Sequence, residues 1–191
     1  MIKILYVRET KEKNLLSLGI FEGEETARYT LDAKFVESMR ISSGDEITED
    51  GLSEIKRRDA YIRGKKKALS LLAFADNSKE SLKQKLYRFG IDRETTAKII
   101  DEVTSLGYIN ESGQIRRMVE RLANGQLMGP KKILMRLVSK GYSAGEVKRI
   151  IREMSDSLEI DFSENKRRLI EKYSVEGDTE QENRILYKNG Y

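Results

Sequence analysis

The sequence has no cysteine, no histidine and no tryptophan, and it has one proline in 191 residues. Without cysteine there is no disulfide and no thiolate nucleophile, and without histidine there is no imidazole base and no Cys/His zinc site. The glycine-rich patterns GxxxxGK[ST] and GxGxxG, which bind phosphates, are missing too. These absences predict a protein that is not an enzyme and that uses no cofactor and no metal.

Long apolar segments are also missing. The longest nearly apolar run, ALSLLAFA at residues 68–75, is far shorter than the roughly 20 residues that cross a bilayer. Residues 1–14 lack the apolar core of a signal peptide. Hydrophobic residues make up 38% of the chain and charged residues 36%, which favours a thin, surface-rich architecture. We expect a cytoplasmic protein that makes no membrane contact.

Charge is distributed unevenly along the chain. Residues 1–55 hold 7 basic and 12 acidic side chains (net −5), residues 56–154 hold 23 and 11 (net +12), and residues 155–191 hold 6 and 9 (net −3). A basic middle between acidic ends suggests an anionic partner for the middle. The alternative is a lysine-rich helical surface that is simply solvated.

The first third of the chain predicts a small β-structure. Three short segments rich in β-branched, leucine and aromatic residues are separated by charged turns, a pattern typical of a three-strand meander: 2–9, 14–21 and 25–31. A short helix is expected at residues 32–40, capped by Asp32. Residues 42–51 predict a turn-rich connector, and we interpret its acidic run as an exposed turn.

From Leu52 onward the apolar residues recur with a helical period. A long helix is expected at 52–75, with Gly64 as a candidate break. Ser78 caps a second helix whose apolar face carries Leu82, Leu86 and Phe89, and Gly90 ends it. Asp92 caps a third helix.

The same three-helix pattern recurs further along the chain. An offset of 51 residues aligns Ser78 with Gly129, and Gly90 with Gly141; Pro130 then occupies a first helical position. A third, shorter copy is offset by 49, which brings Gly190 into the place of Gly141. Capping boxes are expected at Ser143/Glu146 and Asp178/Gln181. On the second helix of the middle copy, the expected buried face comprises Ile133, Leu137 and Val138.

These repeats predict the fold class and the domain organisation. Units of about fifty residues bury little surface alone, so stacked copies share a core. We expect a mainly α protein: tandem three-helix repeats in an elongated array, with a small N-terminal β-meander. The expected domains are an N-terminal β-rich extension with a short helix (1–55), repeat 1 (56–107), repeat 2 (108–156) and an incomplete repeat 3 (157–191).

Three segments in this order carry a resemblance: SKESLKQKLYRFGI (78–91), VTSLGYINE (103–111) and GPKKILMRLVSKGYS (129–143). Together they resemble the RecX regulatory proteins of bacteria over residues 60–191, and the meander resembles the N-terminal extension of some Gram-positive members. The chain departs from the family's Leu-Asp-Asp at 109–111, where it has Ile-Asn-Glu, and from Phe-Ala at 114–115, where it has Gln-Ile.

The resemblance implies a function. RecX proteins bind RecA, the recombinase that polymerises on single-stranded DNA, and restrain the filament's ATPase, strand-exchange and coprotease activities. It implies RecA and the RecA–single-stranded DNA filament as partners, and a role in DNA repair, recombination and the SOS response. We also expect a monomer with weak direct DNA binding. The alternative is a direct DNA-binding regulator that uses the helix pairs as helix-turn-helix readers.

The candidate partner-binding residues form a basic face on repeat 2. The spacing i, i+4, i+8 places Lys132, Arg136 and Lys140 in one stripe of a helix. With their neighbours they make a ten-residue face for acidic protein patches or DNA phosphates: Arg116, Arg117, Arg121, Lys131, Lys132, Arg136, Lys140, Lys148, Arg149 and Arg152.

A secondary basic cluster lies in the first long helix. It comprises Arg57, Arg58, Arg63, Lys65, Lys66 and Lys67. Tyr61 is interleaved among these cations, and its ring could stack on a base. Ordinary half-buried packing is the commoner role and the one we expect.

Overall fold

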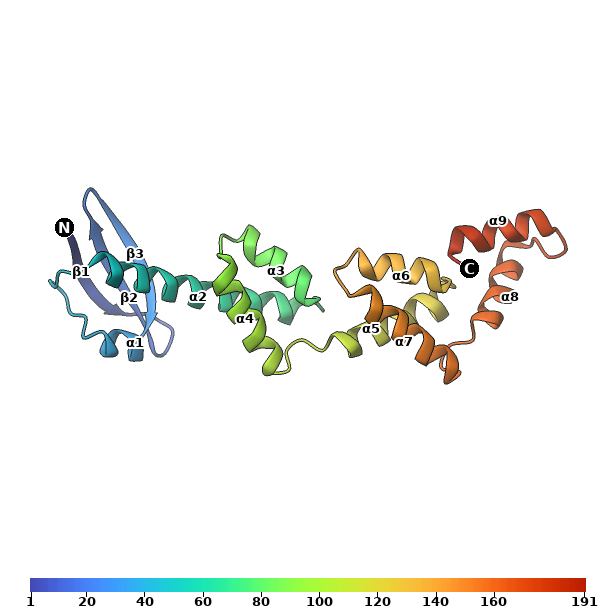
Figure 1. Ribbon diagram of the computed structural model, residues 1–191, viewed down its shortest axis with the longest axis horizontal. Coiled ribbons are helices and arrows are strands. Elements are labelled where there is room, and N and C mark those ends of the chain that lie inside the picture. Colours follow the sequence, from blue (N-terminus) through green and yellow to red (C-terminus); the bar gives the residue numbers. More distant parts are fainter. The chain divides into compact units, whose positions relative to one another are not determined.

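The computed structural model describes all 191 residues. Three strands precede nine α-helices and one π-helical turn (Figure 1), with these bounds: β1 Ile2–Glu9, β2 Leu15–Glu22, β3 Glu25–Asp32, α1 Ala33–Ser38, α2 Glu49–Phe74, α3 Lys79–Arg88, α4 Arg93–Ser105, α5 Glu111–Glu120, η1 Arg121–Gly125, α6 Pro130–Val138, α7 Ala144–Asp156, α8 Phe162–Tyr173 and α9 Thr179–Asn189. The predicted class, mainly helical with an N-terminal meander, is confirmed.

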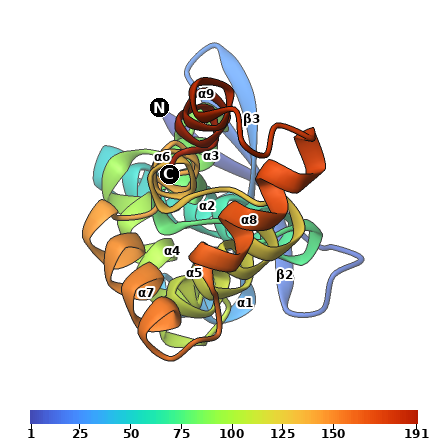
Figure 2. The same ribbon diagram turned by 90° about the vertical axis from the view of Figure 1, so that its right-hand side faces the viewer.

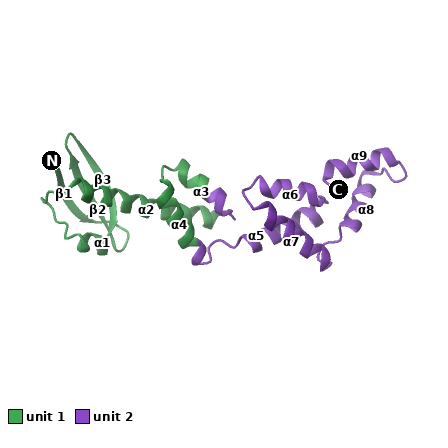
Figure 3. Cartoon of the chain, in the orientation of Figure 1, with its two compact units in different colours: residues 1–74, 83–103 green, residues 75–82, 104–191 purple.

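The chain divides into two compact units (Figure 3). The first comprises residues 1–74 and 83–103, and the second comprises residues 75–82 and 104–191. The division passes through α3, whose first turn belongs with the second unit. The domain boundaries expected from the sequence stay a prediction.

The meander forms an antiparallel sheet in the order β1-β2-β3. Ile20 of β2 lies opposite Ile4 of β1 and Ala27 of β3. Because side chains alternate between the two faces of a strand, one face of this register is apolar and packs under α1 and α2. The buried residues there are Ile4, Leu18, Ile20, Leu31, Val36, Ile41, Leu52 and Ile55. Asp32 caps α1 as predicted, accepting a hydrogen bond from the backbone N–H of Phe35 at 3.0 Å.

Helix α2 corrects one expectation, because it runs unbroken through Gly64. Gly64 is buried and faces α4, and a Cβ atom at this position would lie 2.6 Å from Cδ1 of Ile99 and 3.1 Å from Cγ1 of Ile91. The missing side chain therefore lets the two helices approach closely. The helix also begins earlier than predicted, since Glu49 and Asp50 form its first turn.

Three predicted glycine turns are confirmed. Gly90, Gly141 and Gly190 end the second helix of successive copies, with φ of 87°, 88° and 86°. This left-handed conformation is strained for any residue that has a Cβ. The equivalent residues Leu86 and Leu137 are fully buried.

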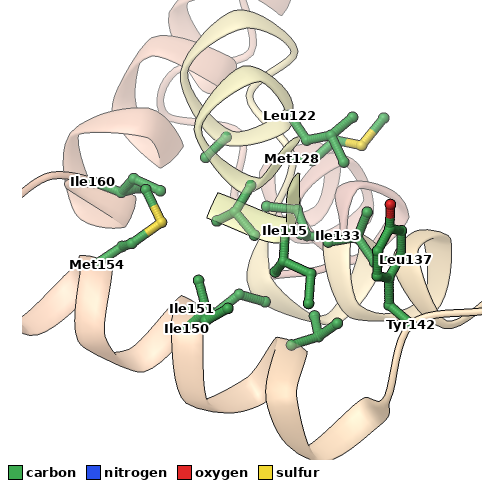
Figure 4. Close-up of a cluster of buried hydrophobic side chains, with 13 residues drawn as sticks. Ile115, Leu122, Met128, Ile133, Leu137, Tyr142, Ile150, Ile151, Met154 and Ile160 are labelled. Carbon is green, nitrogen blue, oxygen red and sulfur yellow. The ribbon is translucent and has the colours of Figure 1, made fainter. Parts of the chain in front are cut away.

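The middle repeat has a continuous apolar core (Figure 4). Helices α5, α6 and α7, together with η1, surround these side chains: Ile115, Val119, Leu122, Ala123, Met128, Ile133, Leu137, Tyr142, Val147, Ile150, Ile151, Met154 and Ile160. One buried polar bond joins this core, from the hydroxyl of Tyr142 to Oε1 of Gln114 at 2.9 Å.

Some local expectations were wrong. Val138 and Phe89 were assigned to buried faces, but each is 42% exposed. Ser143 precedes α7 without making a side-chain capping bond. Its expected partner Glu146 accepts instead from Ser112 at 2.7 Å and Arg149 at 2.5 Å. The carboxylate of Glu146 is thus bonded to other donors, and the expected capping box is not formed.

Candidate interaction surface

The middle repeat projects its basic residues outward because their neighbours are fixed inward. On α6, Ile133 and Leu137 are fully buried, and on α7 Val147 and Ile150 are nearly so. With helical spacing, the charged residues between these positions fall on the opposite faces. The ten predicted cations are all at least partly exposed, but they differ in what they contact.

Three of the ten are neutralised by carboxylates. Arg116 contacts Glu159 at 2.9 Å and Glu153 at 3.5 Å, and Arg117 contacts Asp76 at 2.9 Å. A third arginine of the predicted face, Arg149, lies between two glutamates of its own helix.

The guanidinium of Arg149 bonds Glu146 and Glu153, both at 2.5 Å. These hydrogen bonds raise the pKa of Arg149, and the bond from Arg149, followed by that from Ser112, lowers the pKa of Glu146. Exposed pairs of this kind add little stability. They do lower the net positive charge of this part of the surface, because α5 and α7 present carboxylates beside the arginines there.

Three more cations lie on α6 and make polar contacts. Arg136 donates to Oε1 of Gln126 at 3.3 Å, and Lys131 lies within 3.5 Å of the carbonyl oxygen of Tyr191. Lys132 is only partly exposed and donates to the carbonyl oxygen of Lys188 and to Oδ1 of Asn189, both at 3.2 Å. Within the predicted stripe, Lys132 is therefore hydrogen-bonded to residues of α9.

Four cations have no ion pair and no side-chain hydrogen bond, and we call them the uncommitted cations: Arg121, Lys140, Lys148 and Arg152. All four are exposed, and they come from η1, the turn that follows α6 and the outer face of α7. Their charges are available to an anionic partner without the breaking of an existing contact.

The secondary cluster on α2 is largely neutralised within the first unit. Four of its six cations bond carboxylates: Arg58 to Asp32 at 2.6 Å, Arg63 to Asp59 at 2.7 Å, Lys65 to Glu102 at 2.8 Å, and Lys66 to Glu12. Lys67 lies over the ring of Phe89 at 5.4 Å. Arg57 has neither a carboxylate partner nor a ring contact. It lines an open cavity of about 400 Å³ among α1, α2 and α4.

Tyr61 is held within this cluster as a packing residue. Its hydroxyl bonds Glu102, and its ring is covered by the guanidinium of Arg58 at 5.4 Å and the amine of Lys65 at 6.0 Å. Burial, followed by the hydrogen bond to Glu102, raises the pKa of Tyr61 to about 12. Tyr61 therefore has the ordinary role of a half-buried packing residue.

Sequence reasoning could have found some of these pairings and not others. The Arg149 pairs with Glu146 and Glu153 follow from i, i+3 and i, i+4 spacing. The partners Lys65 and Glu102 lie 37 residues apart, so their pairing required the packing of α2 on α4.

The chain has no cluster of three or more side chains that could ligate a metal ion. None of the helices combines the length and apolarity needed to cross a lipid bilayer.

Known proteins resemble this chain in both sequence and fold. No family model matches the sequence. "Regulatory protein RecX" of Clostridioides difficile is 28% identical over 128 residues, covering 67% of this chain and 60% of the relative. The protein of the same name from Listeria monocytogenes is 24% identical over 151 residues, covering 79% of this chain and 56% of the relative. The chain thus spans less than two thirds of the length of these relatives.

Two crystal structures show the same fold. A structure described as regulatory protein RecX superimposes with a TM-score of 0.71 and 17% identity, covering 100% of this chain and 95% of that one. RecX from Lactobacillus salivarius superimposes with a TM-score of 0.59 and 23% identity, covering 70% and 89%.

Proposed function

Because this chain belongs to the RecX family, we propose that it binds RecA and RecA filaments on single-stranded DNA and restrains their ATPase, strand-exchange and coprotease activities. The observation that carries the proposal is the sequence similarity to regulatory proteins named RecX over most of the chain, in a fold that two RecX crystal structures share. The proposed setting is DNA repair, recombination and the SOS response in the cytoplasm.

The uncommitted cations support this proposal physically. A filament of protein on single-stranded DNA carries the negative charge of the phosphates, and exposed cations accelerate encounter with such a surface. Arg116, Arg117 and Arg149 already have carboxylate partners. We therefore assign the larger share of the contact to Lys140, Lys148 and Arg152, with Arg121, and a smaller share to the paired arginines.

The test reverses three uncommitted charges at once. The variant Lys140→Glu/Lys148→Glu/Arg152→Glu should keep the helical circular dichroism of the wild-type protein, because these side chains are exposed and make no ion pair. It should inhibit the DNA-dependent ATPase of RecA poorly. Inhibition by the wild-type protein should weaken as salt rises, because surface charges beyond a Debye length of about 8 Å are screened at physiological ionic strength.

A matched control changes the net charge equally elsewhere in the same unit. Arg168, Lys172 and Arg184 are exposed residues of α8 and α9 without ion pairs. The triple substitution of these residues by glutamate should inhibit RecA nearly as well as the wild-type protein. Equal inhibition by both triple variants would remove the uncommitted cations from the contact. Tight binding of duplex DNA by the wild-type protein without any effect on RecA would favour the helix-turn-helix alternative instead.

A further inference from the structure

The end of α9 meets the beginning of α6 through backbone contacts. Figure 1 and Figure 2 both show the last residue beside α6. The N–H of Gly129 donates to the carbonyl oxygen of Asn189 at 2.7 Å, and the N–H of Lys131 donates to that of Gly190 at 3.1 Å. These are helix-terminal groups that would otherwise lack partners. The C-terminal turn, residues 188–191, therefore satisfies the N-terminus of α6.

The fit at this junction requires glycine on both sides. A Cβ atom on Gly129 would collide with the carbonyl group of Gly190, and a Cβ atom on Gly190 would collide with the backbone N and Cβ of Lys132. The φ of Gly190 is also positive, at 86°. The junction is consequently sensitive to a single methyl group.

The same junction immobilises a functional candidate. Lys132 directs its amine at the carbonyl oxygen of Lys188 and at Oδ1 of Asn189, both at 3.2 Å. It begins the stripe that continues with Arg136 and Lys140. While the turn is docked, the amine of Lys132 is hydrogen-bonded to oxygens of residues 188 and 189. These oxygens lie at the negative end of the α9 dipole.

Helix α9 itself contributes little to the buried core. None of the residues of α9 is fully buried, whereas α6 buries Ile133 and Leu137 completely. Beyond the backbone bonds, the turn is held by Tyr191, whose ring meets that of Phe162 edge-on at 6.4 Å and whose hydroxyl donates to the carbonyl oxygen of Leu127 at 3.3 Å. Elements with few buried apolar contacts open at low free-energy cost.

We propose that the C-terminal turn is a latch that withholds Lys132 and that its release adds this lysine to the basic face of the middle repeat. The consequence for RecA rests on the proposed function; the latch itself does not. An anionic partner that binds Lys132 competes with the carbonyl oxygens of residues 188–189, so partner binding and latch closure oppose each other.

The latch can be opened by a substitution that leaves every lysine in place. Gly190→Ala imposes both left-handed strain and the collision with Lys132. The strain alone, at a cost usual for such residues, shifts the docking equilibrium about 5–30-fold toward the open form. Gly177→Ala is the matched control, because Gly177 also has φ of 86° but nothing within 4 Å of its Cβ position.

The first readout uses the isolated 191-residue chain. Limited acetylation followed by peptide mass spectrometry should show Lys132 reacting several-fold faster in Gly190→Ala than in the wild-type protein or Gly177→Ala. Lys140 and Lys148, which have no polar partner, should react at equal rates in all three. Unchanged reactivity of Lys132 in Gly190→Ala overturns the latch.

The second readout is inhibition of RecA ATPase. Gly190→Ala should inhibit at lower concentration than the wild-type protein and Gly177→Ala, and Gly190→Ala/Lys132→Gln should lose that gain. If the wild-type protein inhibits but Gly190→Ala is no better, the regulatory role of the latch is refuted while the proposed function stands. If the wild-type protein has no effect on RecA, the proposed function fails, and the acetylation rates alone decide the latch.

Discussion

Replacing Gly141 by alanine tests how the second helices of successive repeats are joined. Gly141 ends α6 with φ of 88°, and its position for a Cβ atom lies 2.7 Å from Oγ of Ser78 and 3.2 Å from the backbone N of Ser81. Ser78 also donates a hydrogen bond to the carbonyl oxygen of Lys140 at 2.8 Å. The added methyl group therefore strains the backbone and displaces the serine that holds the start of α3 to the end of α6.

The chain supplies a control for the first of these effects. Gly90 ends α3 with φ of 87°, but nothing lies within 4 Å of its Cβ position. Gly90→Ala should cost the left-handed strain alone, about 1–2 kcal/mol. Gly141→Ala should add the loss of a hydrogen bond, about 0.5–1.5 kcal/mol, and therefore reach about 1.5–3.5 kcal/mol.

The comparison uses two kinds of measurement on each variant. Urea unfolding followed by circular dichroism at 222 nm gives the free energy of unfolding of each variant. Native-state hydrogen exchange then assigns the loss, which for Gly141→Ala should fall on amides at both the end of α6 and the start of α3. Equal losses in the two variants, or normal protection at the start of α3 in Gly141→Ala, would refute the reasoning.

Two further predictions concern buried polar contacts. Tyr142→Phe removes the partner of the buried Oε1 of Gln114 and should destabilise the protein by about 1–3 kcal/mol, measured by urea unfolding, whereas Tyr187→Phe, on an exposed residue, should be neutral. The hydrogen bond from Lys65, then that from Tyr61, lowers the pKa of Glu102 below its ordinary value of 4.5. The stability that this carboxylate contributes is thus present above pH 4.5 and lost as pH falls through its folded pKa. Lys65→Met should flatten the fall in melting temperature over this acid range, and an unchanged fall would contradict the assignment.

Features set by neighbours in the sequence were predictable. Asp32, Ser78 and Asp92 each accept a hydrogen bond from the N–H three residues later, so the capping pattern alone located three helix starts. The strands of the meander and the glycine turns at 90, 141 and 190 are similarly local.

Features set by packing were not predictable. Gly64 reads as a helix break, because its sequence context does not include Ile91 and Ile99, which occupy the space a side chain would need. Lys132 reads as a free member of a stripe, because its partners lie 56 and 57 residues later in α9. The candidate face was therefore definable as a set of cations, while the division into paired, latched and uncommitted members required the fold.

Helix α2 has a mechanical consequence for the first unit. Its 26 residues form one rod of about 39 Å. Leu52 and Ile55, near its start, belong to the core beneath the sheet, while Gly64 lies against α4. Because the helix is unbroken between these two attachments, it ties the sheet to α4 within the first unit. A displacement of the sheet is therefore carried along α2 to its contact with α4, and no hinge in the helix absorbs it.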